Sequence, residues 1–307
     1  MAGRPVVVLA GGTGGAKLAR GILDLVGADL AVVANTGDDV EVYGGHVSPD
    51  PDLVLYWLAD RIDERGWGLR GDTFHVMDGL REIGADPWFS LGDRDLAVAL
   101  QRRRRLAEGA RLTETLAELA EALGVAARVL PMSDDPVRTR VRHAGRWWSF
   151  QEYMIRAGGR GPVDQVVFEG ADRALPSADV ADAVSRAVAI VIGPSNPVAS
   201  IGPILALPGM REALVAARAP VVAVSPIVGG RVVKGPTEPF MRWAGREPSA
   251  AGVVAAYAGV IDGLVADEPA DGLPVLQIDT LMADARSRRR VAEETLDFAL
   301  RLGGGDG

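Results

Sequence analysis

The sequence contains no cysteine among its 307 residues, and aromatic residues make up 5% of it. The absence of cysteine excludes disulfides, thiolate metal sites and a cysteine nucleophile, without identifying a redox compartment. No apolar run reaches the length needed to cross a bilayer, and the N-terminus leads directly into a strand pattern. We therefore expect no transmembrane helix, no signal peptide and no membrane partner, and we predict a cytoplasmic protein.

The balance of charge also excludes a class of function. A formal net charge of −8 argues against a general nucleic-acid-binding protein. The arginine run Arg102–Arg105 is a local exception, which we interpret as the solvated face of a helix. The length suits one large domain or two modest ones, and 48% hydrophobic with 24% charged residues is ordinary for a globular enzyme.

The most informative stretch is residues 6–17, which read VVVLAGGTGGAK. Its apolar start predicts a buried strand, its glycines predict a sharp turn, and the following apolar periodicity predicts a helix from Gly15. A helix N-terminus after such a turn binds phosphate. The stretch matches neither common fingerprint, because Lys17 replaces the third glycine of a dinucleotide motif and Leu18 follows where a P-loop needs Ser or Thr. A tight turn without a ligand is the alternative.

Strand and helix patterns alternate over most of the chain, which predicts an α/β fold of three layers with a mostly parallel sheet. Strands are predicted at residues 30–34, 128–130, 165–168, 189–192, 221–224, 263–266 and 275–278, with a hairpin of 137–143 and 146–153. Helices are predicted at 52–62, 73–83, 93–106 and 113–123. We therefore predict a nucleotide-binding core of residues 1–49 and 125–307 and a mostly helical insert of 50–124. The tail 303–307 is predicted to be disordered.

Polar loops follow several of the predicted strands. They span residues 11–17, 35–39, 132–136, 193–197 and 225–234. In a parallel sheet such loops converge on one edge, where ligands bind. The hydrogen-bonding side chains in these loops, which are typical of a nucleotide site, are Thr13, Asn35, Ser133, Ser195, Asn196 and Ser225.

Acidic residues gather close to the second of these loops, at Asp38, Asp39, Asp50 and Asp52. Carboxylates beside a phosphate site indicate a divalent cation, most simply Mg²⁺, because unscreened anions would repel the phosphates. Each Asp taken alone could equally be a helix cap or turn former.

Histidine and aromatic residues carry weaker signals. His46 lies close to the acidic loop and could touch a substrate, whereas His75 and His143 are interpreted as structural or exposed. The aromatic residues of the predicted insert either pack its core or line a slot for a flat ring. They are Trp57, Trp67, Trp88 and Phe89.

Eight motifs in order carry a resemblance to a known family. They are residues 11–14, 35–36 with 39, 48–50 with 52, 91–95, 131–136, 193–197, 225–227 and 279–282. Together they closely resemble the 2-phospho-L-lactate transferases, the CofD/FbiA family of deazaflavin coenzyme F-420 biosynthesis. The resemblance covers roughly residues 6 to 298 and implies a Rossmann-like sheet domain with a smaller helical insert.

The resemblance also implies an activity. The enzyme would take a guanosine diphosphate-linked donor, lactyl-2-diphospho-5′-guanosine or its enolpyruvyl relative. It would transfer the 2-phospholactyl or phosphoenolpyruvyl group to the ribityl hydroxyl of Fo (7,8-didemethyl-8-hydroxy-5-deazariboflavin) and release GMP. Mg²⁺ would be the cofactor, the partners would be these small molecules, and the protein would be a homodimer.

Site residues follow from the matching motifs as hypotheses. Asp39 and Asp50 would be catalytic and would hold the metal, and Asp39, Asp50 or Asp52 would act on the hydroxyl. Fo would lie near Asp50, Asp52, His46, Trp88 and Ser90. The diphosphate and guanosine would contact Gly11, Gly12, Thr13, Gly14, Lys17, Asn35, Ser133, Asp134, Ser195 and Asn196.

Two other functions stay open. Relatives with the same sheet include non-enzymatic nucleotide-binding regulators, although the motifs at 48–50 and 91–95 match the transferase branch. A nicotinamide-dependent dehydrogenase is disfavoured, because Asn35 stands where that fold wants an acidic residue. The stretch Val40–Tyr43 departs from the more apolar version typical of many members, and no residue decides between lactyl and enolpyruvyl donors.

Overall fold

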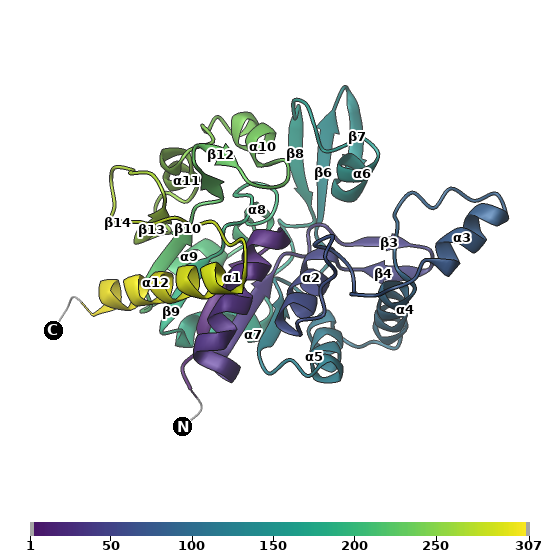
Figure 1. The fold of residues 1–307 in the computed structure, drawn as a ribbon, viewed down its shortest axis with the longest axis horizontal. Helices are drawn as coiled ribbons and strands as arrows, with labels where there is room; N and C mark the ends of the chain where they lie inside the picture. The colour runs from purple at the N-terminus through teal and green to yellow at the C-terminus, as the bar shows by residue number, and fades with distance from the viewer. Residues whose placement is uncertain (1–2, 305–307) are drawn as a thin grey trace.

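The computed structural model describes residues 3–304, and its centre is a parallel sheet (Figure 1). Seven strands lie in the order β14-β13-β10-β9-β1-β2-β5, and every neighbouring pair is parallel. Their bounds are β1 Val6–Ala10, β2 Leu30–Ala34, β5 Arg128–Pro131, β9 Ala189–Ile192, β10 Val221–Val224, β13 Gly263–Ala266 and β14 Val275–Gln277. The predicted α/β class with a mostly parallel sheet is confirmed.

Strand β1 lies inside this sheet, between β9 and β2, and is completely buried. Val8 pairs with Val32 of β2 on one side and with Val191 of β9 on the other. The chain adds β2 on one side of β1 and later adds β9 on the other side. Gly11, which directly follows β1, therefore lies at the reversal of strand order, the usual ligand site of such sheets.

Helices cover both faces of the sheet. One face packs against α1 Gly12–Val26 and α12 Ala285–Gly303, which lie side by side in Figure 1, and against α2 Pro49–Leu58 and α5 Leu112–Leu123. The other face packs against α7 Ala178–Arg186, α8 Gly202–Leu205, α9 Met210–Val215 and α11 Ala250–Ala256. The alternation along β1 explains this arrangement, because Val6 and Val8 enter one cluster and Val7 and Leu9 the other.

Two local predictions are wrong. Helix α1 begins at Gly12 rather than Gly15, because Gly11 is extended and the chain turns into the helix immediately. The strand predicted for 146–153 ends at Ser149, as β7 Arg146–Ser149, and α6 Phe150–Ile155 follows. The reason is a capping box. The Ser149 hydroxyl accepts from the Glu152 N–H at 3.2 Å, while the Glu152 carboxylate accepts from the Ser149 N–H at 3.0 Å.

A smaller sheet stands apart from the main one. It contains β7, β6 Arg138–His143 and β8 Gln165–Glu169, all antiparallel. Its apolar side packs with α6 and α10 Thr237–Trp243 through residues such as Tyr153 and Phe240. Helix α6 thereby reaches the edge of the main sheet where the polar loops lie.

The predicted insert contains the expected helices, α2, α3 His75–Glu82, α4 Asp93–Ala107 and α5, although α2 begins earlier and ends earlier than the predicted 52–62. Leu55 of α2 and Leu116 of α5 belong to the main core. Met77 of α3 and Leu96 of α4 instead form a separate cluster with the hairpin of β3 Val40–Val42 and β4 Gly45–Val47. Figure 1 shows α3 projecting from the molecule. The domain boundaries at 49 and 124 stay a prediction.

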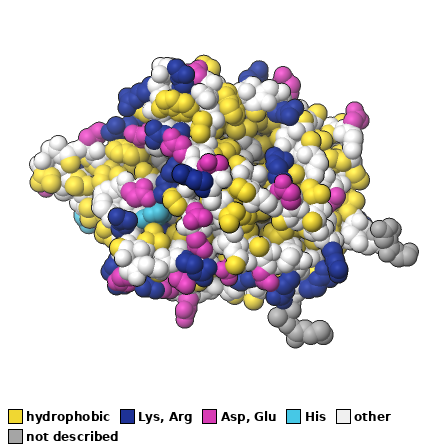
Figure 2. Space-filling view, turned by 180° about the vertical axis from the view of Figure 1, so that it is seen from behind, with side chains coloured by type: hydrophobic (Ala, Val, Ile, Leu, Met, Phe, Trp, Pro, Cys, Tyr) yellow, Lys and Arg dark blue, Asp and Glu magenta, His cyan; other side chains and the backbone are white. Residues whose placement is uncertain are grey.

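The remaining short elements are η1 Gly27–Asp29, β11 Ile227–Val228 and β12 Arg231–Val232. Figure 2 shows the back of the molecule, where positive and negative side chains are interspersed. None of the helices within residues 3–304 combines the length and apolarity needed to cross a membrane. Gly303 ends α12, and the rest of the predicted disordered tail, from residue 305, lies outside the described residues.

Candidate active site

A cavity of about 730 Å³ lies at the carboxyl edge of the main sheet. We call its two sides the core wall and the insert wall. The core wall consists of Gly11, Gly12, Thr13, Gly14, Lys17, Asp38, Ser195, Asn196, Ser225 and Lys234, and the insert wall of Gly66, Trp67, Gly68, Trp88, Phe89, Ser90, Leu91 and Asp95. Helix α2 adds Asp50, Asp52, Leu53 and Tyr56, and α6 adds Phe150 to the lining.

The glycines of the first loop allow two segments to touch. A side chain on Gly14 would collide with the Pro194 carbonyl, and one on Gly15 would come within 2.7 Å of the Ser195 hydroxyl oxygen. The Gly11 N–H donates to that same hydroxyl oxygen at 3.3 Å. The structure therefore brings Ser195 beside the start of α1. Free N–H groups there, with the helix dipole, suit a phosphate.

Asp50 is fixed against this loop. Its Oδ1 accepts from the Gly12 N–H at 2.7 Å, and its Oδ2 accepts from the Asn35 amide at 2.9 Å. Burial raises the pKa of Asp50 to about 6, although these two hydrogen bonds act in the opposite direction. Asn35 does not line the cavity; it orients Asp50 and accepts from the Gly37 N–H at 2.8 Å.

Asp38 faces the cavity from the loop after β2. Its Oδ1 is buried without a hydrogen-bond partner. Burial, and then the nearby charges of Asp50 and Asp39, raise the pKa of Asp38 well above its usual range. The sequence placed Asp38 in the acidic group, and its position after a strand was the signal, but Asp39 was preferred.

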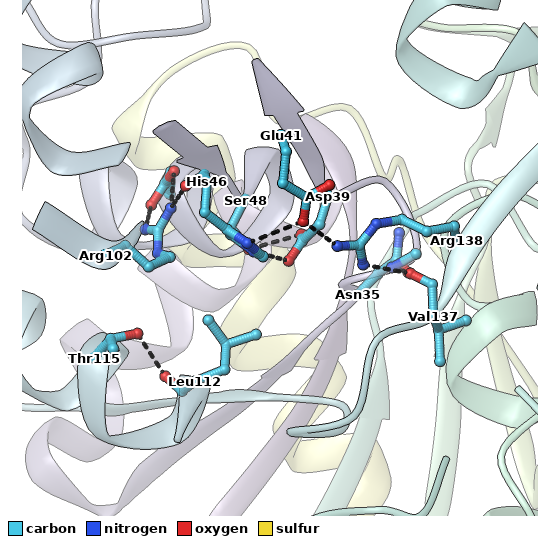
Figure 3. A network of polar contacts seen from close by, with 12 residues as sticks. Asn35, Asp39, Glu41, His46, Ser48, Arg102, Leu112, Thr115, Val137 and Arg138 are labelled. Carbon is cyan, nitrogen blue, oxygen red and sulfur yellow. Dashed lines mark hydrogen bonds and ion pairs between the residues drawn. The ribbon is translucent and has the colours of Figure 1, made fainter. Parts of the chain in front are cut away.

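Asp39 lies in a buried network away from the cavity lining (Figure 3). Its Oδ1 accepts from the Ser48 hydroxyl at 2.7 Å, and its Oδ2 lies 2.9 Å from Nε2 of His46. The other ring nitrogen of His46 lies 3.3 Å from Glu41. Burial alone would lower the pKa of His46, but its contacts with Asp39 and Glu41 raise it. The structure thus brings neither Asp39 nor His46 to the cavity surface.

Asp52 lines the cavity but is paired with Arg102, whose guanidinium donates to both carboxylate oxygens. Arg102 is 3% exposed and also donates to the His46 carbonyl at 2.9 Å. The interpretation of the arginine run as a solvated helix face is therefore wrong for Arg102 and correct for Arg103 and Arg104, which are exposed. Arg102 lies on the side of α4 that faces α2.

Ser133 and Asp134 do not line the cavity either. The Ser133 hydroxyl donates to the Leu175 carbonyl at 2.6 Å. Asp134 accepts from both the N–H and the hydroxyl of Thr113, each at 2.8 Å, and so holds the start of α5 to the end of β5. Their contacts with the guanosine stay a prediction.

Two lysines meet at the first loop. Lys17 donates to the Met282 carbonyl at 3.0 Å, and burial, followed by the charges of Lys234 and Arg288, lowers its pKa. Lys234 donates to the Thr13 hydroxyl at 3.2 Å. The sequence predicts that the loop 225–234 lies at the sheet edge but does not single out Lys234. Both ammonium groups face a cavity where an anion would compensate their charges.

Asn196 and the aromatic residues complete the lining. The Asn196 carbonyl oxygen accepts from the N–H groups of Val198 and Ala199, while its amide nitrogen is buried without a partner. Trp88 stacks on Phe89 with ring centroids 5.5 Å apart. Trp88, Phe89 and Ser90 line the cavity, and a slot there for a flat ring stays a prediction.

The carboxylates of Asp38 and Asp50 suit a divalent cation that the phosphates of a substrate would also bind. Residues 3–304 contain no group of three or more His, Asp or Glu side chains placed to hold a metal. Mg²⁺, however, commonly takes one or two carboxylates together with substrate phosphates and water. The unpartnered oxygen of Asp38 and the mutual repulsion of Asp38 and Asp50 fit such an ion better than an empty pair of anions.

Comparisons with known proteins identify the family. The family model described as 2-phospho-L-lactate transferase CofD matches residues 6–295. A phosphoenolpyruvate transferase of Kitasatospora aureofaciens is 39% identical over 312 residues, which cover 96% of this chain and 97% of that protein. A 2-phospho-L-lactate transferase of Methanopyrus kandleri is 41% identical over 309 residues, covering 97% and 99%.

The fold has a solved counterpart as well. A UPF0052 family protein from Bacillus halodurans superposes with a TM-score of 0.63 at 17% identity, covering 96% of this chain and 99% of that one. This similarity concerns the fold alone. The match of the family model over nearly the whole chain, together with relatives near 40% identity, shows that this chain is a transferase of the CofD family.

Proposed function

We propose that the enzyme transfers a 2-phospholactyl or phosphoenolpyruvyl group from a guanosine diphosphate-linked donor to the ribityl hydroxyl of Fo, releasing GMP. The observation that carries this proposal is the cavity itself. It joins a phosphate-binding helix N-terminus and two buried carboxylates on one side to an aromatic slot on the other. A diphosphate and a flat acceptor can therefore meet beside Asp50.

The core wall would hold the donor. N–H groups at the start of α1 and the ammonium groups of Lys17 and Lys234 would bind the diphosphate. The unpaired amide of Asn196 offers a donor for the nucleoside or its phosphate. These groups are fixed before the substrate arrives, so they stabilise developing charge at little cost of reorganisation.

The reaction needs one bond formed and one broken. The acceptor hydroxyl oxygen forms a bond to the β-phosphorus, the bond from that phosphorus to the bridging oxygen breaks, and GMP leaves with the electron pair. The hydroxyl proton would pass to the carboxylate of Asp50, which lines the cavity, and then to solvent. Lys17 and Lys234, which line the cavity at the first loop, would stabilise the charge that builds on the leaving phosphate.

A bound Mg²⁺ would neutralise charge on the diphosphate oxygens, and Asp38 and Asp50 are the residues that would hold it. Asp39, the other candidate from the sequence, does not line the cavity, and its carboxylate contacts Ser48 and His46. We propose that Asp39 instead keeps the loop of Asp38 in place.

The choice of donor is testable in one experiment. Relatives named for phospholactate and for phosphoenolpyruvate are similar to this chain to nearly the same degree, 41% and 39%. Purified protein, Fo and Mg²⁺ are mixed with each guanosine-linked donor, and the deazaflavin is followed by mass spectrometry. We expect the mass of one phospholactyl or phosphoenolpyruvyl group to be added, with GMP released. Tight nucleotide binding without product from either donor would favour a non-enzymatic regulator.

A further inference from the structure

The segment that leads from the turn after β11 to the start of α10 runs along the edge of the cavity. We call residues 229–235 the strap. None of its residues is buried, and Val233 is 57% exposed although it lines the cavity. Ile227 before the strap and Pro236 after it are both buried. A segment that lines a cavity and is also exposed lies where the cavity opens to solvent, so the strap forms part of the mouth.

The strap is attached mainly at its base. The Gly229 N–H donates to the carboxylate of Asp267, and a ladder of two residue pairs holds β12 against β11. Beyond β12, the described part of the chain shows one hydrogen bond from residues 233–235, which Lys234 donates to the Thr13 hydroxyl at 3.2 Å. Exposed backbone and few buried contacts are typical of segments that open locally at a small cost in free energy.

The insert wall is braced at the point that faces the strap. The Gly66 N–H donates to the carbonyl three residues earlier at 2.9 Å, which closes a turn. Arg65 stacks on Trp67, with its guanidinium carbon 4.3 Å from the ring centroid. A side chain on Gly66 would come within 3.1 Å of Nζ of Lys234. The bare backbone of Gly66 therefore allows Lys234 to reach the insert wall while it contacts Thr13 of the core wall.

The position of Lys234 also brings two like charges together. Lys17 donates to the Met282 carbonyl and Lys234 to the Thr13 hydroxyl, so each ammonium group contacts a neutral oxygen. Burial, and then the charge of Lys234, lower the pKa of Lys17. Two nearby ammonium groups repel each other, and a phosphate between them replaces this repulsion with two attractions. The position of Lys234 across the mouth is therefore more favourable when phosphates occupy the cavity.

We propose that the strap closes across the cavity mouth when the phosphates of the donor bind, with Lys234 as the residue that responds to them. This inference rests on the proposed function and adds a movement to it. The open strap would admit the donor and release GMP. The closed strap would hold the diphosphate still between the core wall and the insert wall while the acceptor hydroxyl attacks.

The test is cleavage of the full chain by trypsin, with GDP and Mg²⁺ as the probe for the donor's phosphates. Trypsin cuts after Arg231, inside the strap, when the segment around that bond unfolds locally. GDP at about 100 times its Kd should slow this cut at least about tenfold, because it binds the closed strap better than the open one. Cleavage after Arg218, an exposed residue before β10 at the opposite edge of the sheet, should keep its rate.

Two variants of Lys234 separate its charge from the fold. Lys234→Met keeps a long side chain without the charge, so GDP at the same multiple of that variant's own Kd should slow the cut after Arg231 less than about twofold. Lys234→Arg keeps a cation and should be protected as wild type is. Arg246→Met removes an exposed cation that does not line this cavity, and it should also behave as wild type.

The absence of cysteine from the chain allows a second readout. A fluorescent dye attached to Arg231→Cys lies on the strap, outside the cavity lining. GDP should change the emission of this dye in the wild-type background and leave it unchanged when Lys234→Met is added.

The possible outcomes separate this inference from the proposed function. Equal protection of the Arg231 cut in wild type and Lys234→Met would overturn the inference. A wild-type strap that is cut equally fast with and without bound GDP would also overturn it. In both cases GDP is bound, so the proposed function stands. Wild-type protein that binds neither GDP nor a guanosine-linked donor would overturn the proposed function and the inference together.

Discussion

The two walls of the cavity are built by different means. The core wall depends on backbone, with glycines of one loop in contact with the next loop and the N–H groups of Gly11 and Gly12 bonded to Ser195 and Asp50. The insert wall depends on side chains that come from helix starts and long loops. Much of the charge near the insert wall holds the insert in place, as Arg102 and Asp93 do. A substitution in the core wall should therefore abolish the transfer reaction, and a substitution in the insert wall should change how tightly the acceptor binds.

The largest effect is expected at the junction of the walls. Asp50→Ala should keep the fold but lower kcat by about 10²–10⁴-fold, because the hydroxyl loses its base and the loop of Gly12 loses an acceptor. Single-turnover transfer to Fo measures this loss, and circular dichroism checks the fold. Asp172→Ala, an exposed acid outside the cavity, serves as the control. A variant with full kcat would remove Asp50 from the mechanism.

The next effect tests how the insert is attached. Arg102→Met should lower the free energy of unfolding by about 3 kcal/mol, because it leaves the carboxylate of Asp52 buried without its partner. Urea denaturation measures this change in the free energy of unfolding. Arg103→Met, one residue away and exposed, should behave as wild type. Adding Asp52→Asn to Arg102→Met should recover part of the loss, and no recovery would argue against an unpaired charge as the cause.

The smallest expected effect concerns Asp95, which has no ion pair within residues 3–304, in contrast to Asp52, which is paired with Arg102. Burial raises the pKa of Asp95 to about 7 in the folded protein from 3.8 ordinarily, so the folded state binds more protons between these values and loses stability as the pH rises through them. Asp95→Asn removes this loss. Relative to wild type, the free energy of unfolding of the variant should rise by on the order of 2 kcal/mol between pH 4 and pH 8. Urea titration at each pH measures this change. A constant difference across that range would mean that Asp95 titrates normally.

The central strands were the most predictable part of the molecule. The five strand residues Leu30–Ala34 and the strand Gly263–Ala266 match their predicted bounds, because short buried apolar runs between turn residues allow few other structures. The polar loops were found for the same reason, since a residue after a parallel strand must lie at the sheet edge. Ser149 shows where a local pattern fails to predict the end of a strand. The alternating pattern continued past it, while a capping box ended the strand.

The individual site residues could not all be chosen from the loops that carry them. Asp38 and Asp39 are neighbours with the same chemistry, yet one faces the cavity and the other contacts His46 and Ser48. Asp134 occupies a sheet-edge loop but caps α5. Which way each side chain points depends on contacts with segments that are distant in sequence, and local patterns contain no record of those contacts.

The sequence by itself determined the parallel sheet, the glycine turn at Gly11 and the family, because each rests on patterns of residues that are adjacent along the chain. The tertiary structure alone decided which carboxylates are free. Arg102 reaches Asp52 across 50 residues and leaves Asp95 unpaired, and Asn35 reaches Asp50 across 15. A carboxylate acquires its pKa and its role from such distant partners and from its burial, so these properties exist only in the folded chain.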